Sequence, residues 1–237
     1  MPPSASTFAA PIDHLFYLIL WISVGAFLLV QGLLLFAIIH YRKRRGVSAS
    51  YFHGRPALEV AWAVIPAAIL LWLAFASRDL WAKVRYQENF PANAQHVEVL
   101  AQQYAWNVRY PGADGRFGKT DAAGVSDQNP FGRVDGDPDG KDDMITLNEM
   151  HLVTGKPLRL TLRSRDVIHS FFVPEFRFKQ DAIPGSAIDV WFTPTRAGKY
   201  EIACAEFCGP AHYRMKGFLT VGTGQEHTEW LKEQASY

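Results

Sequence analysis

Hydrophobic residues of this 237-residue chain are concentrated in its first eighty positions. Positions 15–39 carry no charged side chain, and a helix of that length reaches about 37 Å, enough to cross a membrane core of about 30 Å. A second apolar stretch contains Glu59 near its start and Pro66 inside, and membrane helices tolerate an internal proline. The pattern therefore predicts two transmembrane helices, at 15–40 and 57–78.

The charges around these stretches indicate how the chain crosses the membrane. A cleavable signal peptide is the alternative for the first stretch, but it would carry Lys or Arg before its apolar region and a small-residue cleavage site after it. Here only Asp13 and His14 precede the stretch, whereas the link 41–56 is rich in Lys and Arg. The positive-inside rule therefore places 41–56 in the cytoplasm and predicts an extracytoplasmic N-terminus at 1–14, on the same side as the chain after the second helix.

Glu59 is an acidic residue at a membrane boundary, where a charge is costly. One interpretation is a carboxylate that snorkels to the level of the lipid headgroups. The other is a proton-accepting group at the cytoplasmic mouth of a channel in a partner protein.

Beyond residue 95 the helical period gives way to short segments rich in β-branched and aromatic residues. Turn signals such as Pro111-Gly112 and Pro184-Gly185 separate them. Short strands with regular turns favour an antiparallel sandwich or barrel, which we expect over 85–223 with a short helix and tail at 224–237. The predicted strands are 96–99, 106–110, 158–162, 188–192, 200–203 and 218–221.

Residues 111–143 interrupt this pattern. They contain eight Asp and seven Gly against four Lys or Arg, so we expect a solvated acidic insertion. Four aspartates in it have the alternating spacing of calcium ligands: Asp135, Asp137, Asp139 and Asp143. Thr146 stands where an EF-hand needs a bidentate Glu, so calcium is one hypothesis beside the solvated loop.

The composition excludes several classes of function. Lys and Arg total 24 against 23 Asp and Glu, which is not the basic excess of a general nucleic-acid binder. A hydrophobic content of 49% excludes global disorder. Two cysteines are too few for a disulfide framework or a zinc ribbon. The sequence also lacks the CxxCH motif that a fused c-type haem domain would need.

Both cysteines lie in one cluster near the C-terminus, in the run Cys-x3-Cys-x3-His-x2-Met formed by Cys204, Cys208, His212 and Met215. His169 is the best upstream candidate for one more imidazole, at the end of a predicted strand and before a turn. Soft sulfur ligands favour copper over magnesium, calcium or manganese.

Several arrangements compete for this cluster. A disulfide between Cys204 and Cys208 would leave His212 and Met215 without a role. Two Cys and two His also suit tetrahedral zinc, and a mononuclear blue-copper site needs only one thiolate. Two coppers bridged by both thiolates, each with one imidazole and a weak axial ligand, use every residue. The disulfide and zinc remain open alternatives.

At this cluster the sequence resembles subunit II of the haem–copper cytochrome c oxidases, which carries the mixed-valence CuA centre. The family's Cys-x-Glu-x-Cys-x3-His-x2-Met pattern is matched without a gap. Three further segments match the family: 59–66 at the start of its second helix, 166–170 with its first histidine ligand, and its signature at 181–185. The resemblance implies a two-helix transmembrane hairpin followed by an all-β cupredoxin-like Greek-key sandwich.

The resemblance also implies roles for individual residues. Two coppers would be bound by five side chains and one main-chain carbonyl: His169, Cys204, Cys208, His212 and Met215, with the carbonyl of Glu206. The Glu206 carboxylate would help to hold a magnesium ion shared with subunit I. Asp166 would lie near the docking surface for cytochrome c, and Glu59 at the entrance of a proton path in subunit I. Phe207 and Phe218 are expected in the core or in an apolar shell around the coppers.

The sequence departs from the family at the aromatic motif before the insertion. The family usually has Trp-Tyr-Trp, where this chain has Tyr104-Ala105-Trp106. The first Trp is the residue through which the family receives electrons, so Tyr104 and Trp106 are the candidates here. The insertion 111–143 is longer than we expect for the family and could belong to an altered donor surface.

The implied function is electron transfer. The chain would accept electrons from cytochrome c and pass them to the haem–copper catalytic subunit, where oxygen is reduced to water with proton translocation. It would thus be the redox subunit of the enzyme, in contact with subunit I and other oxidase subunits. A CuA subunit of a nitric oxide reductase and a membrane-anchored zinc-binding structural or assembly module are the alternatives. We expect a multi-pass protein of the bacterial inner membrane with its C-terminal domain in the periplasm or outside, rather than one of the mitochondrial inner membrane.

Overall fold

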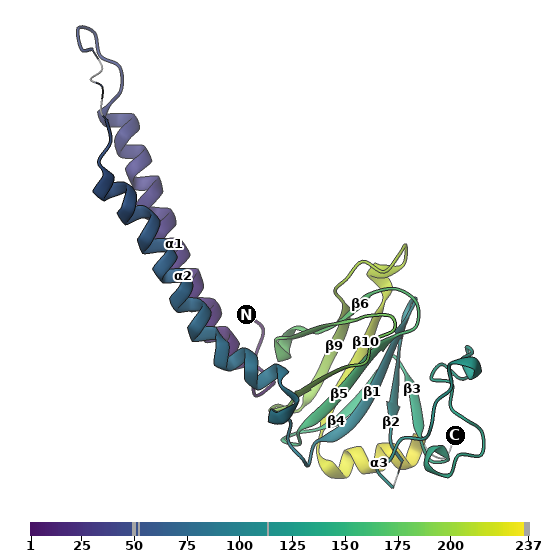
Figure 1. The fold of residues 1–237 in the computed structure, drawn as a ribbon. Coiled ribbons are helices and arrows are strands. Elements are labelled where there is room, and N and C mark those ends of the chain that lie inside the picture. The colour runs from purple at the N-terminus through teal and green to yellow at the C-terminus, as the bar shows by residue number, and fades with distance from the viewer. Residues whose placement is uncertain (49–50, 52, 113, 235–237) are drawn as a thin grey trace. The chain divides into compact units, whose positions relative to one another are not determined.

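The computed structural model describes residues 1–48, 51, 53–112 and 114–234 (Figure 1). Within these residues the chain forms three α-helices, ten β-strands and five short 3-10 helices. It divides into two compact units, one of residues 11–82 and one of residues 1–10 with the chain from Lys83 onward. Each unit is described by itself.

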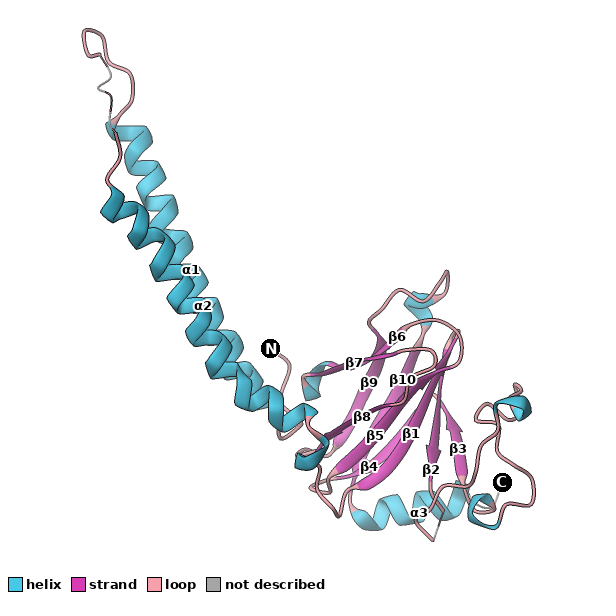
Figure 2. Cartoon of the chain, viewed as in Figure 1, coloured by secondary structure: helices cyan, strands magenta, loops and turns pink. Residues whose placement is uncertain are grey.

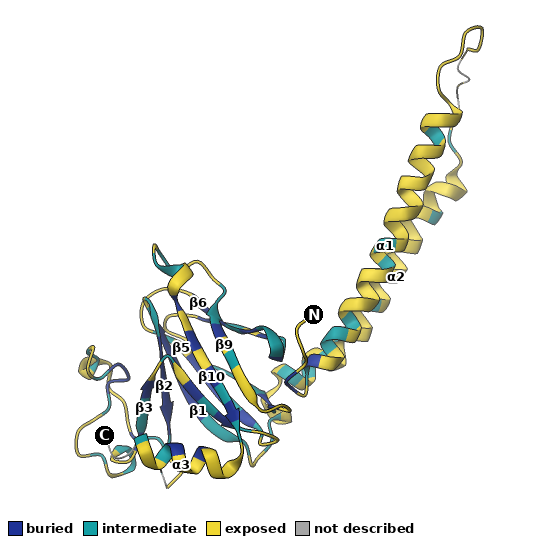
Figure 3. Cartoon of the chain, turned by 180° about the vertical axis from the view of Figure 1, so that it is seen from behind, coloured by how far each residue is buried: buried dark blue, intermediate teal, exposed yellow. Residues whose placement is uncertain are grey.

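The first unit is a helical hairpin of α1 (Ala9–His40) and α2 (Pro56–Arg85), both long and apolar enough to cross a membrane. α1 begins inside the segment predicted as the N-terminus, and α2 continues past position 78 to Arg85. Figure 3 shows that most residues of the two helices are exposed. Apolar side chains that no protein covers are what a lipid-facing helix requires, since its backbone polar groups are already bonded within the helix.

The second unit is a β-sandwich of two five-stranded sheets (Figure 2). The first sheet has the order β3-β2-β1-β5-β8, and the second has the order β4-β10-β9-β6-β7. The strands are β1 (Gln95–Gln102), β2 (Ala105–Tyr110), β3 (Met144–Leu147), β4 (Glu149–Val153), β5 (Leu158–Ser164), β6 (His169–Val173), β7 (Phe178–Ala182), β8 (Ile188–Phe192), β9 (Gly198–Cys204) and β10 (Lys216–Gly222). Figure 2 shows α3 (Gly224–Gln234) across one end of the sandwich and the loop that joins β9 to β10 at the other.

The sequence prediction of the strands was correct for six of them and missed β3, β4, β6 and β7. β3 and β4 are separated by Asn148 alone, whose backbone is left-handed with φ of 57°, so no turn sequence marked the boundary. The sandwich is also not wholly antiparallel. β1 pairs with β5 and β4 pairs with β10 in parallel, which short hairpin connections cannot produce.

The core lies between the two sheets. Val97, Val99 and Ala101 of β1 are fully buried, as are the alternating leucines of β5, because successive strand residues point to opposite faces. Trp106 and Phe171 add large aromatic rings to the same cluster, with centroids 5.4 Å apart. Figure 3 shows this burial along the inner faces of the strands.

The N-terminal residues belong to the sandwich rather than to the helical hairpin. Ala5 is fully buried, its N–H donates to the carbonyl of Glu175 at 2.9 Å, and its carbonyl accepts from the N–H of Thr195 at 2.9 Å. The hydroxyl of Ser6 donates to the carbonyl of Phe176 at 2.7 Å. A chain whose α1 and α2 cross a membrane therefore has its first residues and its sandwich on the same side.

Most described residues of the insertion 111–143 are exposed or half-buried, as expected of a solvated segment, but part of the insertion packs against β2. Phe131 is buried, and the buried guanidinium of Arg109 lies 5.0 Å from the ring of Phe117 and 5.6 Å from that of Phe131. This packing arises because the Arg109 cation of β2 is attracted to the faces of both aromatic rings.

Arg109 also binds two carboxylates and one carbonyl. It donates to Glu98 Oε2 at 3.1 Å, to Asp143 Oδ2 from Nε at 3.1 Å, and to the Gly118 carbonyl at 2.6 Å. The Arg109 side chain is 1% exposed and that of Asp143 0%. A buried charge is tolerated only when it is paired, so Arg109 and Asp143 fasten the insertion to the first sheet.

We expect Arg109→Met to lower the free energy of unfolding of the chain by about 3–5 kcal/mol, because it leaves the buried carboxylate of Asp143 without its partner. Denaturant unfolding followed by tryptophan fluorescence measures this on the full chain in detergent. The control is Arg116→Met in the same insertion, which removes an exposed pair with Asp139 and is expected to cost less than about 1 kcal/mol. Equal losses in the two variants would contradict the anchoring role of Arg109.

Candidate metal centre

The candidate ligands come from two neighbouring strands and the loop beyond them. His169 is the first residue of β6, not the end of the preceding strand as the sequence predicted, and Cys204 is the last residue of β9. β6 and β9 pair antiparallel, with Phe171 opposite Cys204. Cys208, His212 and Met215 follow in the loop between β9 and β10, called the ligand loop below (residues 204–215).

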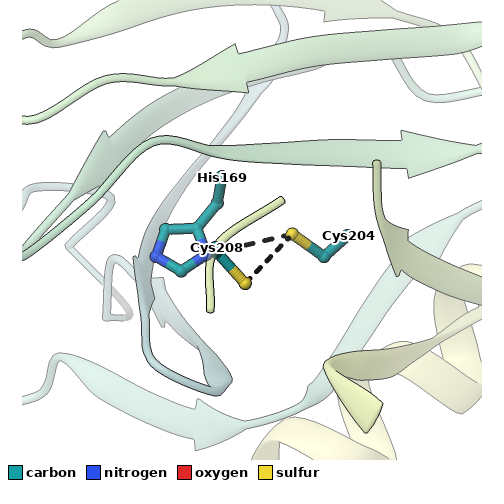
Figure 4. Close-up of side chains that lie close together, drawn as sticks. All are labelled: His169, Cys204 and Cys208. Carbon is teal, nitrogen blue, oxygen red and sulfur yellow. Dashed lines mark hydrogen bonds between the residues drawn. The ribbon is translucent and has the colours of Figure 1, made fainter. Parts of the chain in front are cut away.

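This pairing brings an imidazole and two sulfurs together (Figure 4). The Cys204 sulfur lies 3.9 Å from Nδ1 of His169 and 3.8 Å from the sulfur of Cys208. Ligand atoms of the three residues all lie within 4.8 Å of one another. They form the one group of three or more His, Cys, Asp or Glu ligands found among the described residues.

The remaining predicted ligands surround this group. The Cys208 sulfur lies 3.6 Å from Nδ1 of His212 and 3.7 Å from the Met215 sulfur, and Met215 is buried. The carbonyl of Glu206 lies 3.3 Å from the Cys204 sulfur. The structure therefore gathers all six residues that the sequence assigned to the cluster.

The two cysteines are free thiols. Their separation of 3.8 Å is far longer than a disulfide bond of about 2.05 Å. Burial alone would raise the pKa of Cys204, but contacts with His169 and hydrogen bonds with the backbone of Ser170 and Glu206 lower it to about 6. Burial and the neighbouring Cys204 raise the pKa of Cys208 to about 12. The site thus lowers the pKa of one thiol and raises that of the other.

The donor set fits a soft metal. Two sulfurs shared between neighbouring positions, two imidazoles, a thioether and a carbonyl suit copper, whereas oxygen ligands would be required for calcium or magnesium. The two imidazoles face different sulfurs, His169 at Cys204 and His212 at Cys208, so each sulfur has its own imidazole neighbour.

Asp166 orients the histidine ligand of β6. Its Oδ1 lies 2.8 Å from Nε2 of His169, which leaves Nδ1 to face the sulfurs. Burial opposes ionisation of the Asp166 carboxyl, but its hydrogen bonds to His169 and to the N–H groups of Gln103 and Val167 lower its pKa. A carboxylate that holds the second ring nitrogen fixes the tautomer and the orientation of a ligating histidine.

The aromatic candidates for electron transfer have different surroundings. Trp106 is fully buried, with its ring centroid 6.2 Å from that of His169. Tyr104 is partly buried in the turn between β1 and β2, where it lies against Gly209 of the ligand loop. Trp106 therefore presents no face to an external partner, whereas Tyr104 is partly accessible.

The expectation that two phenylalanines could belong to the core was wrong. Phe207 is 76% exposed and Phe218 52% exposed, so neither belongs to the core. Phe207 is carried by the tip of the ligand loop, and Phe218 points from β10 to the outer face of its sheet. Local hydrophobicity did not show which side of the loop or strand each ring would take.

Three of the four aspartates of the calcium hypothesis are directed to separate partners. Asp143 binds Arg109, Asp137 accepts from the N–H of Lys119, and Asp139 pairs with Arg116 at 3.1 Å. Asp135 is exposed.

Glu59 lies in the first turn of α2 and is exposed there, within the helical unit.

Gln103 is a residue of this site that sequence reasoning missed. Its backbone N–H donates to Asp166 at 2.7 Å, and its side chain donates to the Cys208 carbonyl at 2.6 Å. The only signal in the sequence was its position directly before the aromatic motif.

Two sequence patterns of one family match the chain. "Cytochrome C oxidase subunit II, transmembrane domain" matches residues 1–80, and "Cytochrome C oxidase subunit II, periplasmic domain" matches residues 134–220. The first match contains most of the helical hairpin and the second contains all candidate ligands. The chain is accordingly a membrane-anchored protein with a periplasmic-type C-terminal domain, and its sandwich agrees with the expected cupredoxin-like fold.

Curated relatives match over nearly the full chain. The alternative cytochrome c oxidase subunit 2 of Bradyrhizobium diazoefficiens is 33% identical, over 95% of this chain and 81% of the relative. Cytochrome c oxidase subunit 2 of Thermostichus vulcanus is 32% identical, over 98% and 78%. Among solved structures, the periplasmic domain of subunit II of cytochrome oxidase of Bradyrhizobium japonicum is 25% identical, covering 62% of this chain and 96% of that one, with a TM-score of 0.46.

We expect Asp166→Ala to weaken copper binding by about 10- to 100-fold, because His169 loses the group that fixes its ring. Competition with a copper chelator measures this on the full chain in detergent. The control is Asp181→Ala, which removes a carboxylate bonded to Ser170, the neighbour of His169, without touching a ligand ring. Copper affinities that fall equally in both variants would show that the effect is not specific to the His169 ring.

Proposed function

Because the chain belongs to the cytochrome c oxidase subunit II family, we propose that it is the electron-transfer subunit of a respiratory cytochrome c oxidase. The observation that carries the proposal is the pair of free thiols 3.8 Å apart, with imidazole, thioether and carbonyl donors around them. His169, Cys204, Cys208, His212, Met215 and the carbonyl of Glu206 would hold a dinuclear copper centre. Two copper ions bound there would supply reversible one-electron chemistry.

The protein groups suit this role because they are held nearly still. His169 and Cys204 are parts of paired strands, and Cys208 and Met215 are buried, so the ligands need little rearrangement when the charge of the site changes. The buried Cys208 and Met215 also keep water from the inner side of the site. The surrounding hydrogen bonds and apolar groups would set the reduction potential.

The chain would receive electrons from cytochrome c and deliver them to the haem–copper catalytic subunit of the same complex, where oxygen is reduced to water. Tyr104 is the better candidate for receiving the electron, since it is partly accessible and contacts the ligand loop, whereas Trp106 is buried.

The exposed Glu206 carboxylate would face subunit I and hold the shared magnesium. Glu59 would mark the proton path, and the relatives named above support a bacterial inner membrane.

We expect the full chain in detergent, reconstituted with copper, to bind two coppers and to give an electron paramagnetic resonance spectrum with hyperfine splitting from two equivalent nuclei. Both results are expected because each of the two thiolates would be shared by both copper ions. Metal content and the spectrum are measured on the same sample. Cys208→Ser is the matched variant, and the shared pattern should be lost in it.

Two other results would contradict this assignment. A spectrum from one localised copper would show that the sulfurs are not shared between two ions. Tight binding of zinc without a visible chromophore would support a structural zinc module instead.

The acidic insertion gives a prediction about the donor. Asp127 and Asp135 are exposed, and a negative surface raises the rate of encounter with a basic cytochrome c. Replacing both with Asn should lower the association rate severalfold at low salt and little at high salt. Stopped-flow kinetics measures this, with Glu229→Gln and Glu233→Gln on α3 as a control of equal charge. Rates that match the control at every salt concentration would leave the insertion no part in docking.

A further inference from the structure

Gln103 connects two segments that carry different parts of the metal site. It lies in the turn between β1 and β2, outside both β6 and the ligand loop. Its backbone N–H donates to Oδ2 of Asp166 at 2.7 Å, and its side-chain Nε2 donates to the carbonyl of Cys208 at 2.6 Å. One residue therefore holds the segment before β6 and the ligand loop at the same time.

The side-chain bond acts on Cys208, which lies outside the strands, whereas His169 is also paired with Ala182 of β7. β6 and β9 are paired at Phe171 with Cys204 and Phe172 with Ala203, and after one more bond, from the Ala205 N–H to the Ser170 carbonyl at 3.0 Å, the ladder stops just past Cys204. Cys208 lies four residues beyond it. Gln103 reaches Cys208 directly and reaches His169 through Asp166, whose other oxygen lies 2.8 Å from that ring.

Gly209 shows how closely the turn and the ligand loop are packed. A Cβ at this position would lie 2.5 Å from the Tyr104 hydroxyl and 2.9 Å from Nε2 of Gln103, and the backbone has φ of +133°. Only glycine fits such a close approach with this backbone. The absence of a side chain at Gly209 therefore leaves room for the Gln103 amide beside Cys208.

We propose that Gln103 is a positioning residue for the metal centre, which fixes the distance between the His169 ring and the Cys208 sulfur by bonding Asp166 and the Cys208 carbonyl at once. The proposal deepens the proposed function and rests on it, because the ligands are those of the dinuclear copper site. The Gln103 side chain contacts the main-chain carbonyl of Cys208, which is not a candidate ligand atom. Its effect is on geometry rather than on electron transfer itself.

The test compares Gln103→Met with Gln102→Met in the full chain in detergent. Met has nearly the length of Gln but cannot donate to the Cys208 carbonyl, while the backbone bond to Asp166 remains. Gln102 is the matched control, since its side chain accepts from Arg165 at 3.0 Å and does not reach the ligand loop. Each variant thus loses one side-chain hydrogen bond near the same turn.

Three readouts separate positioning from a loss of folding. In the metal-free chain, amide exchange of residues 204–215 should become faster in Gln103→Met and stay unchanged in Gln102→Met. In the copper-loaded chain, release of copper to a chelator should become about 10-fold faster in Gln103→Met alone. The hyperfine splitting should become unequal between the two nuclei, which a general loss of stability would not produce.

Wild-type behaviour of Gln103→Met in all three readouts would overturn the proposal, as would equal changes in the control. If Gln103→Met does not fold, Gln103→Glu takes its place, because a carboxylate of the same shape also lacks the donor. Gln103→Lys retains a donor of sufficient reach and should restore the slow exchange. A wild-type chain that fails to bind two coppers would contradict the proposed function, and the metal-free exchange comparison would still decide the role of Gln103.

Discussion

The arrangement of this site depends on the pairing of β6 with β9. His169 and Cys204 are 35 residues apart in the sequence, yet the strand pairing places the imidazole of His169 3.9 Å from the sulfur of Cys204. The other ligands follow Cys204 along the chain and need only a loop that folds back. A non-local contact thus supplies the one ligand that the local cluster lacks, and the stability of the sandwich is what maintains it.

Features set by local sequence could be predicted, and those set by distant contacts could not. The long apolar runs identified the helices, and the spacing of Cys204, Cys208, His212 and Met215 identified the ligand loop. β6 was missed because His169 follows a turn-like segment, and its strand character comes from pairing with β7 and β9. The role of Gln103 was invisible for the same reason, since both of its partners lie more than sixty residues away.

A charged side chain fastens a neighbouring segment at two places in the sandwich, one buried and one exposed. Arg109 joins the insertion to the first sheet by pairing with Asp143, and Asp166 joins the segment before β6 to its histidine. In each place a hydrogen-bonded charged group links a loop segment to a strand. The acidic composition of the insertion suggested only solvation, because the arginine that orders it lies outside it in β2.

The packing of Ala5 and Ser6 into the sandwich has a consequence for biogenesis. In a membrane-inserted chain, the residues that complete this edge of the domain are separated from the rest of it by both helices. They must be exported across the bilayer before the domain can close over them. Export of the first ten residues and final folding of the domain are therefore linked events, and a chain inserted with its N-terminus on the wrong side would carry a sandwich with an open edge.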